Sequence, residues 1–123
     1  MKTAEREQKS STRETDTKKI VLAFIDAMNN EDFDSARKYV NNDMKFEGVL
    51  GSRDGANAYF NDMEKMRLKY SVVKVFYDQD DVCLFYNIDM SGKTIFTAGW
   101  YSIIDGKISS IRVVFDPRPV LKS

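Results

Sequence analysis

The spacing of apolar side chains changes once along this chain, near Lys69. Before that point apolar residues recur at helical spacing, and after it they alternate every second residue, which is the period of a β-strand. The alternating part predicts four strands, over 70–77, 82–90, 94–104 and 107–115. The segments between these strands are so short that they favour antiparallel neighbours. The second half of the chain is therefore predicted to form an antiparallel meander.

The last strand has the clearest ends. It begins after the tight turn Asp105-Gly106 and stops at 116–119, which reads Asp-Pro-Arg-Pro. Proline has no backbone N–H to donate to a neighbouring strand, so these prolines mark the end of the ladder. We expect the last strand to be the spine of a curved sheet against which the helices pack.

The predicted strands carry apolar residues on both faces. In the first of them, Val73 and Val75 alternate with Val72 and Phe76. An antiparallel sheet with one face in water should instead alternate apolar with polar residues. We therefore expect helices to cover one face and a second copy of the chain to cover the other, as a homodimer paired through the outer sheet face.

Helical spacing predicts three helices before the meander, over 18–29, 33–39 and 53–67. Asp16 or Thr17 is expected to cap the first of them and Asp32 the second. A short extended piece and a glycine-bounded bend, over 44–51, connect the second helix to the third. Helices followed by a run of strands are typical of an α+β domain.

The chain has 123 residues, and its length fits one domain, which we place over 16–119. Residues 1–15 mix acidic and basic side chains and predict a flexible charged tail, with a docking arm for a partner as the alternative. Residues 120–123 are expected to form a short C-terminal tail.

Charge balance and missing residue types exclude several functions. The 19 basic and 19 acidic side chains cancel, which argues against nucleic acid or a membrane surface as partner. The chain has no histidine and a single cysteine, Cys83, so we expect no metal site, no cofactor and no internal disulfide. A lone cysteine and the lack of a signal-peptide core favour a cytoplasmic location.

Two short motifs stand at fixed places in this order of elements. Asp32-Phe33-Asp34 follows the first helix, and Gly106-Lys107-Ile108 opens the last strand. The pattern resembles the nuclear transport factor 2-like superfamily, and within it the SnoaL-like and ketosteroid isomerase-like proteins, over about 17–119. The resemblance implies a cystatin-like, cone-shaped roll of about three N-terminal helices on a strongly curved, mostly antiparallel sheet. It also implies one apolar pocket and, often, a homodimer.

The catalytic residues of two members of this group have no counterparts here. In the ketosteroid isomerase register, Gly48 stands at the aspartate base, Phe24 at the oxyanion-binding tyrosine and Trp100 at the protonated aspartate. That mechanism needs a base and paired donors, so steroid-type isomerisation is not expected. In the polyketide cyclase register, Ile111 and Val113 replace a His-x-Asp pair. Whether the chain is an enzyme stays open.

If the chain is an enzyme, Asp116 and Glu47 are its candidate catalytic bases. Asp116 and Arg118 form either a charged pair at the pocket mouth or a turn pair at the end of the last strand, and we favour the turn. Strand alternation puts Asp116 opposite Val113 and Phe115, so it reaches a pocket on their side only through a bulge. Glu47 would act only if it pointed inward with a raised pKa.

The pocket is expected to be apolar, with a few amphipathic aromatic side chains. Tyr59, Tyr86 and Tyr101 can each hydrogen-bond a ligand carbonyl or lie in the core with the hydroxyl at an edge. Trp100 is the first candidate for a pocket wall. The ligand-pocket residues that we predict are Phe24, Met28, Tyr59, Met63, Tyr86, Trp100, Val113, Phe115 and Arg118.

These observations predict a SnoaL-like protein that binds an unknown small apolar ligand. The alternatives are an isomerase, cyclase or hydratase acting on an apolar carbonyl compound, and a protein-interaction module. A buried, unpaired carboxylate facing the cavity would favour the enzyme. A fully packed interior would favour the interaction module, and a cavity whose polar groups are only Tyr and Trp would favour binding.

Overall fold

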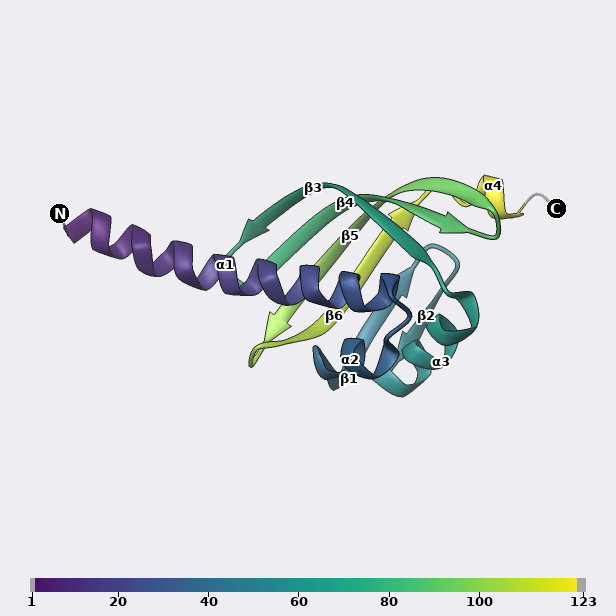
Figure 1. Ribbon diagram of the computed structural model, residues 1–123, viewed down its shortest axis with the longest axis horizontal. Coiled ribbons are helices and arrows are strands. Elements are labelled where there is room, and N and C mark those ends of the chain that lie inside the picture. Colours follow the sequence, from purple (N-terminus) through teal and green to yellow (C-terminus); the bar gives the residue numbers. More distant parts are fainter. Residues whose placement is uncertain (1, 122–123) are drawn as a thin grey trace.

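Figure 1 shows the computed structural model of the chain, which describes residues 2–121 and, from Asp16 onward, their side chains. The elements follow in the order α1 (Lys2–Asn29), α2 (Phe33–Lys38), β1 (Val40–Gly48), β2 (Gly51–Asp54), α3 (Ala56–Met66), β3 (Lys69–Asp78), β4 (Asp81–Met90), β5 (Lys93–Ile104), β6 (Lys107–Phe115) and α4 (Arg118–Leu121). The predicted α+β class is confirmed, since helices at the N-terminus pack on a mostly antiparallel sheet.

The sheet has six strands in the order β2-β1-β6-β5-β4-β3. β3, β4, β5 and β6 each run antiparallel to the next, as the short connections predicted. β6 also pairs in parallel with β1, with Phe46 opposite Ile111. The last strand therefore lies inside the sheet between β1 and β5, which confirms its central place.

Several boundaries in the first half of the chain differ from the sequence-based expectation. α1 begins at Lys2, so a helix start capped by Asp16 or Thr17 is wrong. The Glu, Lys and Arg residues of that segment favour helix without any need for an apolar face. Residues 51–54 form the edge strand β2, and α3 begins only at Ala56. Asp32 does cap α2, because its carboxylate accepts the Ser35 N–H at 3.2 Å.

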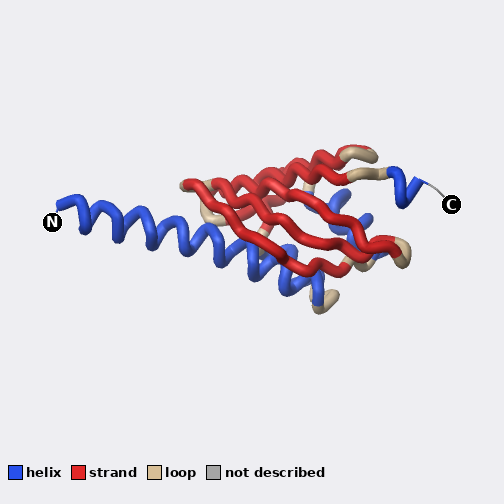
Figure 2. Tube along the Cα trace, turned by 90° about the horizontal axis from the view of Figure 1, so that it is seen from above, coloured by secondary structure: helices blue, strands red, loops and turns tan. Residues whose placement is uncertain are grey.

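The helices α1, α2 and α3 lie on the concave side of the curved sheet (Figure 2). From α1, Val21, Phe24, Ile25 and Met28 are buried against the inner side chains of the strands. The inner set on β4 includes Leu84, which is fully buried. The main core is thus a layer between α1 and the sheet, and it stabilises the fold by removing these apolar surfaces from water.

The opposite, convex face of the sheet carries an apolar cluster that we call the outer-face patch, made of Phe76, Phe85, Phe96, Trp100 and Val114. Phe96 and Trp100 are 59% and 46% exposed. The rings of Phe85 and Phe96 stack at 5.9 Å, and Arg112 lies over Trp100 at 5.5 Å. The structure thus confirms the two-sided apolar character of the strands.

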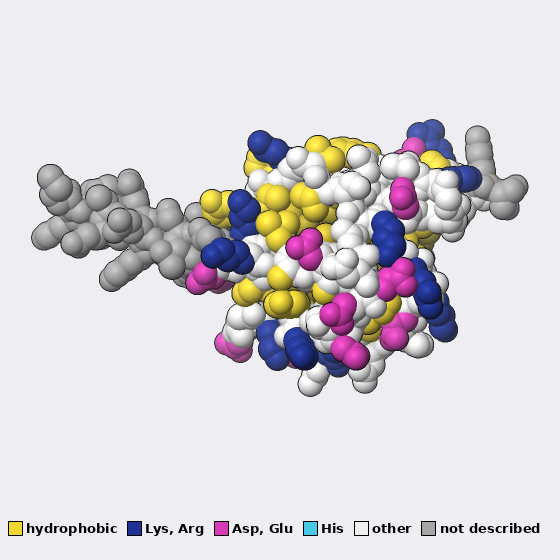
Figure 3. Space-filling model, in the orientation of Figure 1, with side chains coloured by type: hydrophobic (Ala, Val, Ile, Leu, Met, Phe, Trp, Pro, Cys, Tyr) yellow, Lys and Arg dark blue, Asp and Glu magenta, His cyan; other side chains and the backbone are white. Residues whose placement is uncertain are grey.

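The helical side of the molecule mixes charged side chains with small exposed apolar groups. In the view of Figure 3, hydrophobic side chains lie above α1, where β3 runs, and acidic and basic side chains surround them. The exposed apolar side chains of β3 include Val72, Val73 and Tyr77. No helix within residues 2–121 is long and apolar enough to span a membrane.

Candidate functional site

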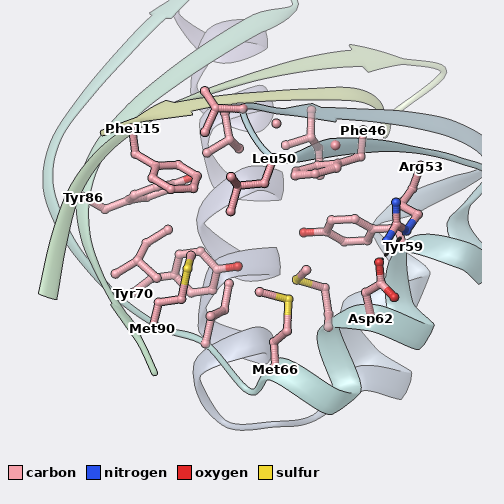
Figure 4. Close-up of a pocket in the computed structure, with 18 of the residues that line it drawn as sticks. Phe46, Leu50, Arg53, Tyr59, Asp62, Met66, Tyr70, Tyr86, Met90 and Phe115 are labelled. Carbon is pink, nitrogen blue, oxygen red and sulfur yellow. Dashed lines mark hydrogen bonds and ion pairs between the residues drawn. The ribbon is translucent and has the colours of Figure 1, made fainter. Parts of the chain in front are cut away.

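A cavity of about 170 Å³ lies inside the cone, between α3, the concave face of β3–β6 and the hairpin of β1 and β2 (Figure 4). Most of its wall is apolar. The apolar wall residues include Phe46, Leu50, Met63, Met66, Leu68, Ile88, Met90, Ile111, Val113 and Phe115. Residues from both halves of the chain therefore surround a single, partly enclosed space.

Four tyrosines from four different elements also line this cavity: Tyr59 on α3, Tyr70 on β3, Tyr86 on β4 and Tyr101 on β5. The Tyr59 and Tyr70 hydroxyls point into the cavity from opposite sides (Figure 4). The Tyr86 and Tyr101 hydroxyls hydrogen-bond each other at 2.7 Å. Phenol hydroxyls are therefore the main polar groups that this interior offers to a ligand.

The end of α1 holds Tyr70 in place. The Asn29 side-chain amide donates to the Tyr70 carbonyl at 2.8 Å, and its oxygen accepts the Tyr70 N–H at 2.7 Å. Lys69 adds a bond from its ammonium group to the Asn29 carbonyl at 2.7 Å. This double hydrogen bond anchors the first residues of β3, so the Tyr70 ring is directed inward.

Ring contacts hold the other tyrosines. Tyr59 packs against Phe46 and Phe60 with ring centres 5.3 and 5.2 Å away. Tyr70 meets Tyr86 edge-on at 5.2 Å. Edge-to-face contacts of this kind favour one ring orientation over others. The hydroxyl positions are thus set by packing as well as by hydrogen bonds.

Because Gly99 on β5 has no side chain, the Tyr86 hydroxyl can occupy the space beside its backbone. A Cβ atom at this position would lie 2.2 Å from the Tyr86 hydroxyl oxygen and 3.0 Å from a ring carbon of Tyr101. No side chain fits at that distance, so glycine is needed here for the close approach rather than for its backbone freedom.

Burial raises the pKa of all four cavity tyrosines above the ordinary value of a phenol. The ionised form is disfavoured because a phenolate inside an apolar wall loses its hydration. All four side chains are consequently neutral at physiological pH, and each keeps a proton that it can donate in a hydrogen bond.

Two charged side chains stand at the edge of the cavity, and they neutralise each other. Arg53 of β2 donates to the carboxylate of Asp62 on α3 at 2.5 Å (Figure 4). Their side chains are 47% and 31% exposed. The pair thus ties the β1–β2 hairpin to α3 at the rim, where water screens it.

Five of the predicted pocket residues do line this cavity: Tyr59, Met63, Tyr86, Val113 and Phe115. Phe24 and Met28 are fully buried instead in the core layer under α1. Phe24 contacts Phe60 and Tyr101 through ring edges at 6.3 and 6.2 Å, behind the cavity wall. The expectation that Phe24 and Met28 face the pocket is therefore wrong, because α1 packs on the sheet away from the opening.

Trp100 is not a pocket wall either. It lies in the outer-face patch, and its indole N–H donates to the Asp81 carboxylate at 2.9 Å. The flanking residues Gly99 and Tyr101 face inward. Side chains alternate along a strand, so a register error of one residue moves a side chain to the opposite face. The expectation that Trp100 forms a wall of the pocket is therefore wrong.

Asp116 and Arg118 form a turn pair outside the cavity. Arg118 donates through its side chain to both Asp116 carboxylate oxygens, at 2.6 to 3.0 Å, and through its backbone N–H at 3.0 Å. The Arg118 side chain and backbone lower the pKa of Asp116. An exposed carboxylate with a lowered pKa is a weak base, so neither the mouth position nor the proposed role as base suits Asp116.

Glu47 does not point inward. Its side chain is 63% exposed and lies 3.6 Å from the guanidinium of Arg112 on the surface. Gly48, Ile111 and Val113, which replace the catalytic groups of the related enzymes, do lie on the cavity wall. Among the described residues, the cavity therefore has no carboxylate other than Asp62, and it has no Cys or His ligand for a metal.

The sequence-based reasoning missed Tyr70, Phe46 and the Arg53–Asp62 pair. Plain alternation from the inward Val75 would turn Tyr70 outward, but β3 has a bulge between Val72 and Lys74 that restores its inward direction. The sequence signal that could have indicated Tyr70 is its position at the start of the first predicted strand, directly after the helical part of the chain.

A cone of helices on a curved sheet around one apolar cavity defines the NTF2-like class of proteins. The SnoaL-like domain model matches residues 21–111, and the chain belongs to this family. An NTF2-like protein of unknown function from Cytophaga hutchinsonii is 48% identical, with a TM-score of 0.85 over 86% of this chain and 95% of that one. No curated protein matches the sequence.

More distant solved structures share the fold. A proposed ketosteroid isomerase from Kribbella flavida is 12% identical with a TM-score of 0.77, over 83% of this chain and 78% of that one. A proposed SnoaL-like polyketide cyclase from Jannaschia sp. is 15% identical with a TM-score of 0.77, over 89% and 91%. At these identities the likeness concerns the fold alone, so activity has to be argued from the cavity.

Proposed function

We propose that this SnoaL-like domain binds one small apolar molecule in the cone cavity without transforming it through a carboxylate base. The observation that supports the proposal is a partly enclosed, mostly apolar space whose polar side-chain groups are mainly phenol hydroxyls. Ligand sites commonly combine an apolar wall with a few convergent polar groups. A domain with no site would pack this space, because an empty void forfeits dispersion contacts.

The enzyme alternative finds less support. Its candidate bases, Asp116 and Glu47, lie outside the cavity on exposed surfaces. Asp62 at the rim is held by Arg53. General base catalysis needs a carboxylate within hydrogen-bond reach of the substrate proton, and neither Asp116 nor Glu47 stands against this cavity. The interaction module is disfavoured because the interior is not fully packed.

The test uses toluene as a probe and two neighbouring substitutions. In an NMR titration, toluene should shift the amide signals of cavity residues in the wild-type protein. Val113→Phe, which fills the cavity, should abolish these shifts, whereas Val114→Phe on the outer face should leave them unchanged. If toluene shifts no cavity signal, or if both variants respond like the wild type, the cavity is not a binding site.

We also propose that the domain forms a homodimer through the outer-face patch. Support comes from the exposed, mutually stacked aromatic rings there, since exposed apolar clusters of this kind mark association surfaces. Sedimentation velocity should show a dimer for the wild type and a monomer for Phe96→Glu. Met66→Glu changes a comparably exposed apolar side chain on α3 and should remain a dimer. A monomeric wild type at high micromolar concentration would contradict the proposal.

A further inference from the structure

The size of the cavity limits the ligand to one ring. At about 170 Å³ it falls below the range of roughly 300–1,000 Å³ that is typical of drug-sized ligand sites. It is close to the roughly 150 Å³ apolar cavity that holds benzene in an engineered protein. A fused polycyclic molecule therefore could be enclosed only in part, whereas a substituted single ring fits the space as a whole.

The charges around the cavity favour a neutral ligand. Arg53 and Asp62 are the charged residues among the described side chains that line it, and they pair with each other at the rim. A carboxylate or ammonium group on the ligand would enter an apolar space without a counter-charge of its own. Burying an unpaired charge is strongly unfavourable.

The hydroxyl arrangement favours a hydrogen-bond acceptor on that ring. Tyr86 and Tyr101 satisfy each other at 2.7 Å. The Tyr59 and Tyr70 hydroxyls point into the open space from opposite walls (Figure 4), and a hydrogen bond from Tyr70 to Tyr59 also contributes to the pKa values of the two phenols. Both remain protonated because burial raises the pKa of each phenol. A phenol is a better donor than acceptor, since its oxygen lone pair is delocalised into the ring.

The two converging donors are also rigid. Asn29 anchors the backbone of Tyr70 with two hydrogen bonds, and the rings of Phe46 and Phe60 hold Tyr59. Donors that are already oriented lose little conformational freedom when the ligand arrives, so ordering them subtracts little from affinity. Flexible surface hydroxyls would not discriminate between ligands in this way.

Resting on the function proposed above, we infer that the ligand class is a neutral single-ring carbonyl compound. Its carbonyl oxygen takes the place of Tyr59 as the acceptor for Tyr70, so that Tyr59 and Tyr70 both donate hydrogen bonds to it. The ring occupies the apolar part of the wall formed by Met63, Val113 and Phe115. Tyr59 and Tyr70 are thus the residues that select the functional group, while the apolar wall selects the size.

The experiment compares acetophenone with α-methylstyrene, which has the same shape but carries a methylene group in place of the carbonyl oxygen. NMR titrations follow the amide signals of cavity residues. The wild-type protein should bind acetophenone roughly tenfold more tightly than α-methylstyrene. The variant Tyr59→Phe/Tyr70→Phe should bind the two probes equally, and it should bind α-methylstyrene at least as tightly as the wild-type protein does, which shows that the cavity is intact. Tyr77→Phe removes a hydroxyl outside the cavity and should retain the full preference.

The outcomes separate this inference from the proposed function. Equal binding of both probes to the wild-type protein overturns the carbonyl inference but leaves cavity binding standing. A preference for acetophenone that persists in the Tyr59→Phe/Tyr70→Phe variant likewise overturns the carbonyl inference and leaves cavity binding standing. If neither probe shifts the cavity signals, the cavity does not bind ligands of this size, and the proposed function fails together with the inference.

Discussion

Gly99 offers the sharpest test of how the tyrosine cluster is built. In the variant Gly99→Ala, the new Cβ would lie 2.2 Å from the Tyr86 hydroxyl oxygen, which is far inside contact distance. Tyr86 is fully buried, so its ring can move only by disturbing Tyr70 and Tyr101. We expect the hydroxyl to be displaced and its hydrogen bond with Tyr101 to break.

The cost in the free energy of unfolding follows from two contributions. Overpacking a core by one methyl group costs about 1–3 kcal/mol, and a lost buried hydrogen bond about 1–3 kcal/mol. The two overlap because one displacement causes both, so we expect Gly99→Ala to destabilise the domain by about 2–4 kcal/mol. For a chain of this size the melting temperature should fall by on the order of 10 °C.

Urea denaturation of a double-mutant cycle provides the assay. In the Tyr86→Phe background the oxygen is gone, and the remaining contacts at 3.0 Å require only a small shift. Gly99→Ala should then cost less than about 1 kcal/mol, which gives a coupling free energy of at least about 1 kcal/mol. In the Tyr77→Phe background the cost should equal that in the wild type. Equal costs in the wild-type and Tyr86→Phe backgrounds would refute the steric explanation.

Three further results are expected. Asn29→Ala should destabilise the domain by about 1–3 kcal/mol in urea denaturation, and should weaken acetophenone binding, because it frees the backbone of Tyr70; unchanged binding would mean that Asn29 does not position Tyr70. Asp62→Asn should cost less than about 1 kcal/mol, and less still in high salt, because water screens the pair at the rim; a larger loss would show that the pair is buried. Asp116 has a lowered pKa in the folded protein, so its contribution to stability is present above the unfolded pKa and is lost as pH falls through the folded value. Asp116→Asn should remove this acid-dependent loss without changing acetophenone affinity, and a changed affinity would place Asp116 at the site after all.

The fold was predictable where side-chain patterns are strong. β6 has the predicted bounds because a turn precedes it and prolines follow it, and the meander follows from short connections. β2 was missed because Ser52, Arg53 and Asp54 are all exposed and offer no apolar alternation. The start of α1 was missed because a helix of charged residues has no apolar stripe to recognise.

The site was harder to predict because it depends on relations between strands. Tyr59 and Tyr86 could be named from their chemistry, but their convergence with Tyr70 depends on a bulge in β3 that no residue type announces. Trp100, in contrast, was predicted to line the pocket but lies on the outer face. Both faces of β5 carry apolar residues, so the sequence does not indicate which face is inside, and packing against α1 decides it.

The position of β6 between β1 and β5 also governs when the cavity can exist. β1 and β2 reach the rest of the sheet only through β6, although nearly half of the sequence lies between the end of β1 and the start of β6. A growing chain can pair β3 with β4 and β4 with β5 while β1 still lacks its sheet partner. Contacts so distant in sequence slow folding and leave strand edges open. A fragment that ends before Lys107 should therefore lack the closed cone and have no binding site, however complete its meander.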